Sequence, residues 1–278
     1  MFTGHRRIHI VFMGYEEDRV VYSLVDDQPD KVYFLVDKTS GSRADEYLKA
    51  VISRLTKEKL KPMIITKEIR IFDYYGLMNV LNSIIREEQK ENNIISINVA
   101  SGSSISAIAG YQIACMNKGV KSYYVKASTY TTSEKDGKKK RKKKSLRPST
   151  VGVDETYEVP KYPMQPPLLD HIKLLGMLLK IKKTAYDIGL RQTEVIKMLA
   201  EANLLGKDTI WAKKPDKRRG TKGTLDPNVR RTFKDNFLDE MVERGYLYAD
   251  KRNKEVFVFL TKYGEKTFQM FEPRTLGG

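Results

Sequence analysis

The sequence predicts a two-domain α/β protein, in which a mostly parallel sheet with helices on both faces precedes a smaller, largely helical domain. Short apolar segments alternate with helical segments through the first 130 residues, as in βαβ units. Prolines at 160, 163, 166 and 167 then predict a stiff linker. The length of 278 residues fits about two domains. We expect boundaries at 1–161, 162–167 and 168–278.

Five strands are expected in the first domain, with a helix after each of the first four. The strands are expected at 8–13, 32–36, 63–66, 94–99 and 122–125, with one more possible at 156–159. The helices are expected at 16–27, from the turn at 37–42 through 54, at 75–88 and at 104–117. Right-handed crossovers between these strands give a doubly wound, Rossmann-like sheet.

A strand order of 3-2-1-4-5 would reverse the winding between the first and fourth strands. Ligands bind in the crevice at such a switch point. We therefore expect the loops at 14–19 and 98–104 to lie side by side, flanked by the loop after the second strand. The candidate ligand contacts in these loops are Gly14, Tyr15, Glu16, Arg19, Thr39, Ser40, Asn98, Ser101, Gly102, Ser103 and Ser104.

The segment 98–104 joins a strand to a helix rich in small residues and has the chemistry of an anion site. Gly102 allows close approach of the backbone, the serines donate, and the free N–H groups of the helix N-terminus carry partial positive charge. Glu16 lies in an acidic cluster that is either catalytic or, as we favour, a partner of the helix dipole. Tyr15 either stacks on a base or packs at the strand end.

Several classes of site are not expected. No G-x-G-x-x-G follows the first strand and no P-loop motif is present, so we expect neither a dinucleotide cofactor nor NTP hydrolysis. The three histidines are scattered and Cys115 is the single cysteine, which argues against a metal centre. A single cysteine also fits a reducing cytoplasm. No apolar run is long enough for a membrane span, and the N-terminus lacks the apolar core of a signal peptide.

The net charge of +16 is concentrated in the second half of the chain. Residues 1–130 carry net +3, residues 131–161 carry net +5 and residues 162–278 carry net +8. An excess of this kind attracts a polyanion such as DNA or RNA, although general solubility is the simpler alternative. The basic run at 133–149 either touches an anionic ligand or is a solvated loop without a specific role.

The second half predicts the order helix, helix, helix, hairpin, helix of a winged helix-turn-helix domain. The helices are expected at 168–179, 192–205, 227–244 and after Thr261, and the hairpin strands at 246–248 and 256–260. Asp226 and Pro227 begin the third helix, and Gly245 ends it. Phe233, Phe237, Met241 and Val242 are expected to be buried.

A winged helix of this composition suits double-stranded DNA, because a helix fits the major groove and the wing reaches phosphates. The third helix offers Asn228, Arg230, Arg231 and Lys234, and the hairpin turn at 250–254 offers Lys251, Arg252 and Lys254. The helix at 192–205 is a rival reading helix. The alternative use of the domain is protein contact or dimerisation.

Residues 8–130 resemble the CRISPR-associated Rossmann-fold (CARF) sensor domains, and the order of the two domains resembles archaeal CARF–winged-helix regulators. The residues that carry the resemblance are Gly14 to Glu16, Asp18 and Arg19 after the first strand, and Asn98 to Ser104 before the small-residue helix. The resemblance implies a symmetric homodimer that binds a cyclic oligoadenylate across its interface on these loops.

The resemblance also raises the question of catalysis, because some CARF proteins slowly cleave the ring. Many relatives carry Lys or Arg just after the Ser-Gly-Ser triplet, where this chain has Ser104. Such a cation could stabilise the negative charge that develops during cleavage. We therefore expect a ligand-responsive, DNA-binding transcription regulator without catalytic residues. One alternative is a ring nuclease whose winged helix only dimerises, and another is a regulator that senses some other nucleotide or no ligand.

Overall fold

The computed structural model describes residues 5–39, 43–131, 149–162, 164–182, 189–205, 211–213, 224–253 and 255–272. Ser40, Lys254 and all but the last residue of the basic run at 133–149 lie outside these ranges. The chain divides into two compact units, and the second begins at Pro167. Each unit is considered separately below.

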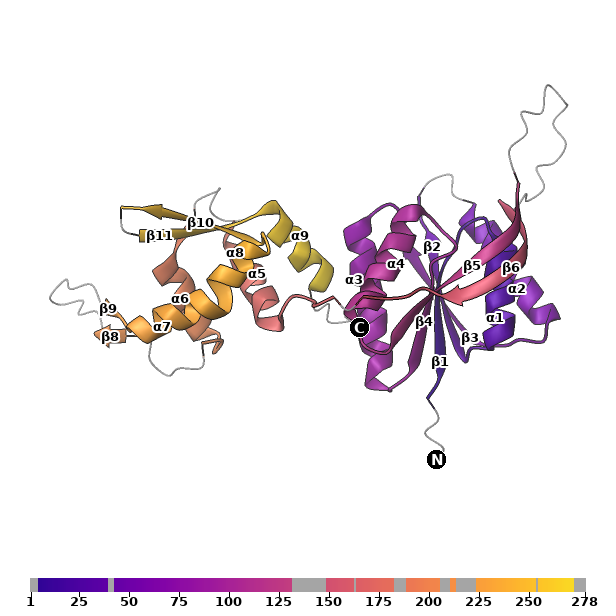
Figure 1. The fold of residues 1–278 in the computed structure, drawn as a ribbon, viewed down its shortest axis with the longest axis horizontal. Coiled ribbons are helices and arrows are strands. Elements are labelled where there is room, and N and C mark those ends of the chain that lie inside the picture. Colours follow the sequence, from indigo (N-terminus) through magenta and orange to yellow (C-terminus); the bar gives the residue numbers. More distant parts are fainter. Residues whose placement is uncertain are drawn as a thin grey trace, which may run out of the picture. The chain divides into compact units, whose positions relative to one another are not determined.

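A six-stranded sheet forms the centre of the first unit (Figure 1). Its strands are β1 (Arg7–Phe12), β2 (Lys31–Asp37), β3 (Met63–Ile69), β4 (Ile94–Asn98), β5 (Val120–Tyr130) and β6 (Thr150–Glu158). They lie in the order β3-β2-β1-β4-β5-β6. The first five strands are parallel and β6 is antiparallel to β5. The α/β class, the Rossmann-like sheet and the predicted order 3-2-1-4-5 are therefore confirmed.

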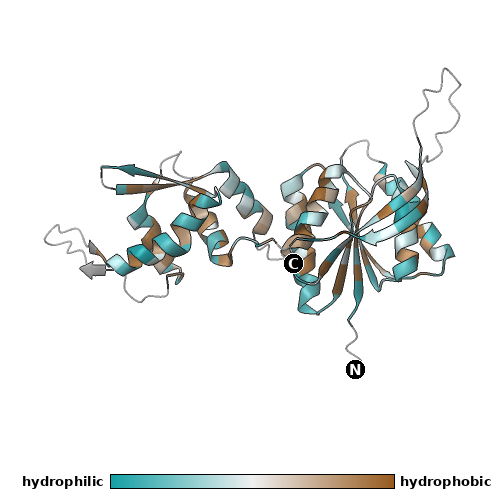
Figure 2. Ribbon diagram, viewed as in Figure 1, coloured by the Kyte–Doolittle hydropathy of each residue, from teal (hydrophilic) through white to brown (hydrophobic). Residues whose placement is uncertain are grey.

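Four helices cover the two faces of this sheet. They are α1 (Glu17–Asp27), α2 (Ala44–Lys57), α3 (Tyr74–Lys90) and α4 (Ser104–Met116). Helices α1 and α2 pack together on one face, and α3 and α4 pack together on the other (Figure 1). Strands β1 and β2 are buried on both faces, which explains their nearly continuous apolar sequences (Figure 2).

The last two strands are longer than the sequence indicated. β5 runs to Tyr130 and pairs with β6 from Thr150 onward, with a register shift between Lys126 and Ala127. In the outer parts of both strands, apolar and polar side chains alternate and most residues are exposed. An edge ribbon of this kind has little apolar signal, so the prediction placed only its buried core at 122–125 and one end of β6.

The second unit combines helices with a three-stranded antiparallel sheet. Its main elements are α5 (Leu169–Lys182), β7 (Leu190–Arg191), α6 (Gln192–Glu201), α7 (Pro227–Phe233), η1 (Lys234–Leu238), α8 (Asp239–Glu243), β10 (Leu247–Arg252), β11 (Glu255–Leu260) and α9 (Lys262–Phe271). A two-stranded ribbon of β8 (Trp211–Lys213) and β9 (Thr224–Leu225) lies between α6 and α7. β11 pairs with β10 on one side and with β7 on the other.

The predicted third helix is one continuous helix that contains a π-helical turn. The residues that join α7, η1 and α8 all keep right-handed helical backbone angles. Phe233, Phe237 and Met241 are buried as expected, but Val242 is 37% exposed and its prediction is wrong. The π turn inserts an extra residue per turn and rotates the residues that follow, which moves Val242 off the buried face.

The hairpin turn is tighter than predicted. β10 continues through Arg252, which pairs with Glu255, so only two residues connect the strands. Asn253 takes a left-handed conformation, with φ of 46°. Asn tolerates this conformation better than most residues. Separately, none of the helices among the described residues is long and apolar enough to span a lipid bilayer.

Candidate functional site

The loops that follow β1 and β4 start from neighbouring strands. β1 and β4 pair in parallel, with Val11 opposite Asn98. The two loops therefore leave the carboxyl edge of the sheet at adjacent positions. The backbone N–H of Gly14 donates to Ser101 Oγ over 3.2 Å, and Ser101 Oγ donates to Glu16 Oε2 over 3.3 Å. The two loops that the sequence paired are thus in direct contact.

Gly14 stands where the two backbones approach most closely. A Cβ atom at this position would lie 2.6 Å from the backbone nitrogen of Gly102 and 2.3 Å from Glu16 Oε2. Real side chains do not tolerate such distances, and a backbone nitrogen cannot simply rotate away. The contact between the loops therefore requires glycine at position 14.

The turn after β4 is held by a reciprocal cap at the start of α4. Ser103 Oγ accepts from the backbone N–H of Ser106 over 3.1 Å, and Ser106 Oγ accepts from the N–H of Ser103 over 2.8 Å. Gly102 has φ of 94°, where an added Cβ would lie 2.6 Å from Ser106 Oγ. Asn98 Oδ1 accepts from the N–H of Ala100, which closes the first part of the turn.

The three serines of this turn have different surroundings. Ser101 is buried and bonded to the loop after β1, while Ser103 Oγ also donates to the carbonyl of Ile71 over 3.2 Å. Ser104 is exposed, and among the described residues its hydroxyl has no hydrogen-bond partner. Ser104 is therefore the serine whose side chain is available to a ligand without breaking an existing contact.

Glu16 turns its carboxylate toward the turn after β4. Burial raises its pKa, and Arg19, the Ser101 hydroxyl and the backbone amides of Gly102 and Tyr15 offset this only partly. The carboxylate thus occupies the donors at which an anion would bind. A partly desolvated acid beside a hydroxyl also has the arrangement expected of a general base.

The neighbouring acids have a structural role. Arg54 of α2 pairs with Glu17 over 3.2 Å and with Asp18 over 2.5 Å. Asp18 Oδ2 also accepts from the backbone N–H of Gly152 over 2.7 Å. Burial alone would raise the pKa of Asp18, but the bonds from Arg54 and Gly152 lower it. These two acids connect α1, α2 and β6, in keeping with a non-catalytic assignment.

Arg19 does not lie on the open side of the loop. Its side chain is 4% exposed, and its Nε donates to the carbonyl of Val125 over 2.6 Å. Its guanidinium carbon lies 4.8 Å from the centre of the Tyr124 ring. One guanidinium nitrogen, Nη2, is buried and has no hydrogen-bond partner among the residues that the structure describes. Arg19 joins α1 to β5, and a ligand contact would require its guanidinium to move.

Tyr15 and Thr39 belong to the loops that follow β1 and β2. The Tyr15 ring is 41% exposed and packs at 5.0 Å and 35° against Tyr47 of α2. Its carbonyl accepts from the N–H of Ser149, which ties the loop to the start of β6. Thr39 is exposed and bonded to Asp37. The other predicted contact in that loop, Ser40, lies outside the described residues.

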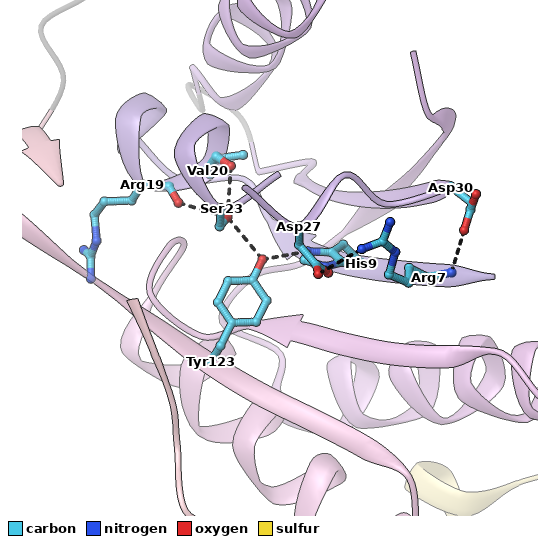
Figure 3. A network of polar contacts seen from close by, with 8 residues as sticks. All are labelled: Arg7, His9, Arg19, Val20, Ser23, Asp27, Asp30 and Tyr123. Atoms are coloured by element: carbon cyan, nitrogen blue, oxygen red, sulfur yellow. Dashed lines mark hydrogen bonds and ion pairs between the residues drawn. The ribbon is translucent and has the colours of Figure 1, made fainter. Parts of the chain in front are cut away.

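A buried polar network crosses the α1 side of the sheet (Figure 3). His9 Nε2 lies 2.5 Å from Asp27 Oδ2, and His9 Nδ1 lies 2.9 Å from Tyr123 Oη. Tyr123 Oη lies 3.2 Å from Ser23 Oγ. A cavity of about 270 Å³ adjoins this network and is lined by Arg7 among others. No sequence pattern indicates this network, because two of its members, His9 and Tyr123, are 114 residues apart in the chain.

The protonation of His9 decides whether this network resembles a catalytic relay. Burial lowers the pKa of His9 and outweighs the opposing effect of Asp27. A neutral imidazole satisfies every member, since Nε2–H donates to Asp27 and Nδ1 accepts from the Tyr123 hydroxyl. We therefore favour the neutral form despite the short contact with Asp27, and assign the network to joining α1, β1 and β5. Across the described ranges, no group of three or more His, Cys, Asp or Glu side chains is placed to hold a metal ion.

In the second unit, most of the predicted DNA contacts on the continuous helix and the hairpin are exposed. The exposed residues are Asn228, Arg230, Arg231, Lys234, Lys251 and Arg252. Three of the cations form ion pairs. Arg231 pairs with Asp235 at 3.5 Å, Arg252 pairs with Asp250 at 2.6 Å, and Lys234 pairs with Asp239. Within the described ranges, Arg230 and Lys251 have no ion-pair partner.

Comparison with known proteins gives one family match and one curated relative. Residues 7–130 match the family described as "HFX_2341_N:-like, N-terminal", which is less than half of the chain. The uncharacterized protein MJ1513 of Methanocaldococcus jannaschii is 29% identical over 126 residues. The match covers 42% of this chain and 37% of MJ1513, so the chain spans well under half of that relative.

Three solved structures show a more distant likeness. Can2 from Sulfobacillus thermosulfidooxidans, in complex with cyclic tetra-adenylate, is 15% identical with a TM-score of 0.37, over 92% of this chain and 76% of Can2. Enterococcus italicus Csm6, bound to cyclic hexa-2′-fluoro-hexa-dAMP, is 12% identical with a TM-score of 0.39, over 87% and 55%. VC1899 from Vibrio cholerae is 11% identical with a TM-score of 0.37, over 95% and 64%.

Proposed function

We propose that this chain is a CARF-type sensor joined to a DNA-binding winged helix, and that a cyclic oligoadenylate controls its binding to DNA. The observation that carries the proposal is the contact between the loop at 14–19 and the turn at 98–104 on the carboxyl edge of the sheet. This is the switch point at which such sheets take their ligands. Cyclic oligoadenylates are bound in the similar structures of Can2 and Csm6, which makes them the first ligands to test.

The surface of α4 supports a homodimer in this proposal. The helix contains no charged residue, and Ile108 on its outer side is 50% exposed. A helix that is apolar on all sides is normally covered by protein. A second copy of the chain would cover α4 and bring two N-terminal turns to one twofold axis, where a ring-shaped ligand of matching symmetry would contact both.

Ligand binding is tested with the full chain by isothermal titration calorimetry against cyclic tetra-adenylate, cyclic hexa-adenylate and linear tetra-adenylate. We expect one ring per two chains and weaker binding of the linear form. Ile108→Glu should give a monomer by sedimentation and lose ring binding. Tyr22→Glu is the matched control, because Tyr22 is equally exposed on α1. A wild-type protein that binds no ring would refute the proposal.

The element order of the second unit supports the winged-helix part. β7 lies between the first two helices, α5 and α6, in the chain and pairs with the hairpin as its third strand. The continuous helix from Pro227 then precedes the hairpin, which would form the wing. This arrangement is the one that presents a helix to the major groove. Asp226 caps the helix by accepting from the N–H of Asn228, which leaves the Asn228 side chain exposed at the end nearest the bases.

DNA binding is tested by fluorescence anisotropy on the DNA upstream of the protein's own gene, with and without ring ligand, at several salt concentrations. Arg230→Ala and Lys251→Ala should each weaken binding, and each should reduce the salt slope by about one unit if it contacts phosphate. Lys262→Ala, an exposed cation on α9, should change neither. Equal affinity in the presence and absence of ligand would refute ligand control.

Slow ring cleavage is the alternative function, and the position of Glu16 beside Ser101 is the observation that favours it. A base at this point would take the proton of a ribose 2′-hydroxyl, and the 2′-oxygen would attack the adjacent phosphorus to form a 2′,3′-cyclic phosphate. The bond from phosphorus to the 5′-oxygen of the next nucleotide breaks, and that leaving oxygen takes a proton from water. Incubation with labelled cyclic tetra-adenylate separates the two functions. A linear product that disappears in Ser101→Ala and Ser103→Ala would favour the nuclease.

A further inference from the structure

A cavity of about 550 Å³ lies at the carboxyl edge of the sheet, between the segments that follow β2 and β3. It is lined by Lys38, Thr39, Arg70, Phe72 and Asp73. This volume falls within the range of small-molecule sites. Its lining combines two cations with an exposed aromatic ring, a composition that recurs where proteins bind nucleotides.

We propose that this cavity is a nucleotide subsite, in which an adenine ring stacks on Phe72 and the attached phosphate binds Arg70. The inference rests on the proposed function, since the nucleotide belongs to the oligoadenylate held by the two central loops. It adds the segment after β3, which the sequence did not single out, to the loop after β2 that contains Thr39. The ligand would then contact the chain at the central loops and, further out, at this subsite.

Phe72 is the first support for the subsite. Its side chain is 72% exposed, whereas its neighbour Ile71 is only 7% exposed. A turn in which the N–H of Asp73 donates to the carbonyl of Arg70 over 2.9 Å places Phe72 near its apex. A large apolar ring held in water by a closed turn gains stability when a flat partner covers it. Purine bases are such partners.

Arg70 supplies the cation for a phosphate. It is exposed and, within the described part of the chain, has no ion-pair partner. Lys38, the other cation of the cavity, is already paired with Glu68. The carboxylate of Asp73 is engaged as the cap of α3, where it accepts from the N–H of Gly76 over 3.1 Å. Arg70 is therefore the residue best placed for a bidentate phosphate contact.

The cavity is held in a fixed position relative to the central loops. Asp37 Oδ1 accepts from the backbone N–H and the hydroxyl of Thr39 and from the N–H of Ile71, which joins the two walls. The carbonyl of Ile71 in turn accepts from Ser103 Oγ at the start of α4. A preformed link of this kind lowers the entropy lost when one ligand binds both regions.

The test compares cyclic tetra-adenylate binding to the full chain and to variants of the subsite by calorimetry. Phe72→Ala removes one stacked base in each subunit of the proposed dimer, so it should raise the Kd by at least about 30-fold, the square of the smallest loss for one base. Phe72→Trp should retain affinity, and Arg70→Ala should lose at least about 5-fold. Tyr22→Ala, which removes an exposed ring elsewhere, should bind as wild type. Because Phe72 is exposed, its variants should keep the wild-type thermal midpoint.

Two results would overturn the inference. One is wild-type affinity in Phe72→Ala. The other is a variant that sediments as a monomer where the wild type is a dimer, which would assign Phe72 to subunit contact. A wild type that binds no ring refutes the proposed function instead. In that case, the subsite is tested by saturation-transfer NMR with 5′-AMP. Transfer from the protein to the adenine protons that is lost in Phe72→Ala would support the subsite, and no transfer in the wild type would refute it.

Discussion

Glu16 offers the sharpest perturbation of the candidate site. Its carboxylate lies beside Ser101 and close to Gly14 and Gly102, where the phosphates of the proposed ligand would bind. An ionised Glu16 therefore repels the ligand. We predict that Glu16→Gln, which keeps the size of the side chain and one acceptor oxygen but removes its charge, binds cyclic tetra-adenylate more tightly than the wild type.

The size of this effect follows from Coulomb's law. With an effective dielectric constant of about 40 and a separation of about 7 Å, one carboxylate and one phosphate repel each other by about 1.2 kcal/mol. A ring on a twofold axis meets Glu16 from both subunits, which doubles the term to about 2.4 kcal/mol. The Kd of Glu16→Gln should therefore fall by roughly 60-fold. Salt should reduce the difference between the proteins.

The assay is calorimetric titration at pH 8 and at pH 5, with Glu17→Gln as the control. Glu17 is the next residue and its loss changes the net charge equally, but it is paired with Arg54 outside the turn. Because burial raises the pKa of Glu16, lowering the pH protonates it before ordinary carboxyl groups. Wild-type affinity should thus rise toward pH 5 and that of Glu16→Gln should change less. Weaker binding by Glu16→Gln would refute the reasoning and show that the carboxylate contacts the ligand favourably.

Three further predictions concern the frame around the site. Gly102→Ala forces a Cβ onto a residue with φ of 94° and to within 2.8 Å of Phe12 Cβ, so it should abolish ring binding in calorimetry and lower the unfolding free energy by about 1 to 2 kcal/mol. His9 has a pKa lowered by burial, so its contribution to stability is present above pH 6.5 and is lost as the pH falls below that value. Urea unfolding should show this as a loss of at most about 1.4 kcal/mol per pH unit, which is absent in His9→Asn. Gly264→Ala places a Cβ 2.1 Å from the carbonyl oxygen of Tyr246, so it should lower the thermal midpoint of the second unit and leave that of the first unchanged in calorimetric scans; a single unshifted profile would contradict this.

The sheet and the meeting of the two loops were predictable because both follow from chain direction. Parallel strands with right-handed crossovers leave few orders, and the reversal beside β1 brings the loops at 14–19 and 98–104 together. The same argument could not reach Arg70 and Phe72. They follow β3, two strands away from β1, and come near Ser103 only because the chain turns at Ile71 to place α3 beside α4.

The side-chain directions were less predictable than the backbone. From the sequence, Arg19 is expected to be a surface cation next to a ligand loop. In the structure, α1 packs against β5 and the Arg19 side chain points inward to Val125 and Tyr124. The helix pattern alone does not specify this, because α1 contacts both β5 and β6. The strand β7 was missed for another reason: it has only two residues and gains its pairing from β11.

Charge illustrates why counting residues is not enough to locate a DNA-binding surface. The sequence assigns net +8 to residues 162–278, but the described helix from Pro227 to Glu243 carries three cations and four acids. Arg231 and Lys234 are turned toward Asp235 and Asp239 of the same helix, so a phosphate must compete with a carboxylate that is already in place. Arg230 lies nearer the N-terminus, away from those acids, where the helix dipole adds to its charge. In the proposed DNA complex, the attraction along this helix would therefore depend on its first turns, the end that a winged helix presents to the base edges.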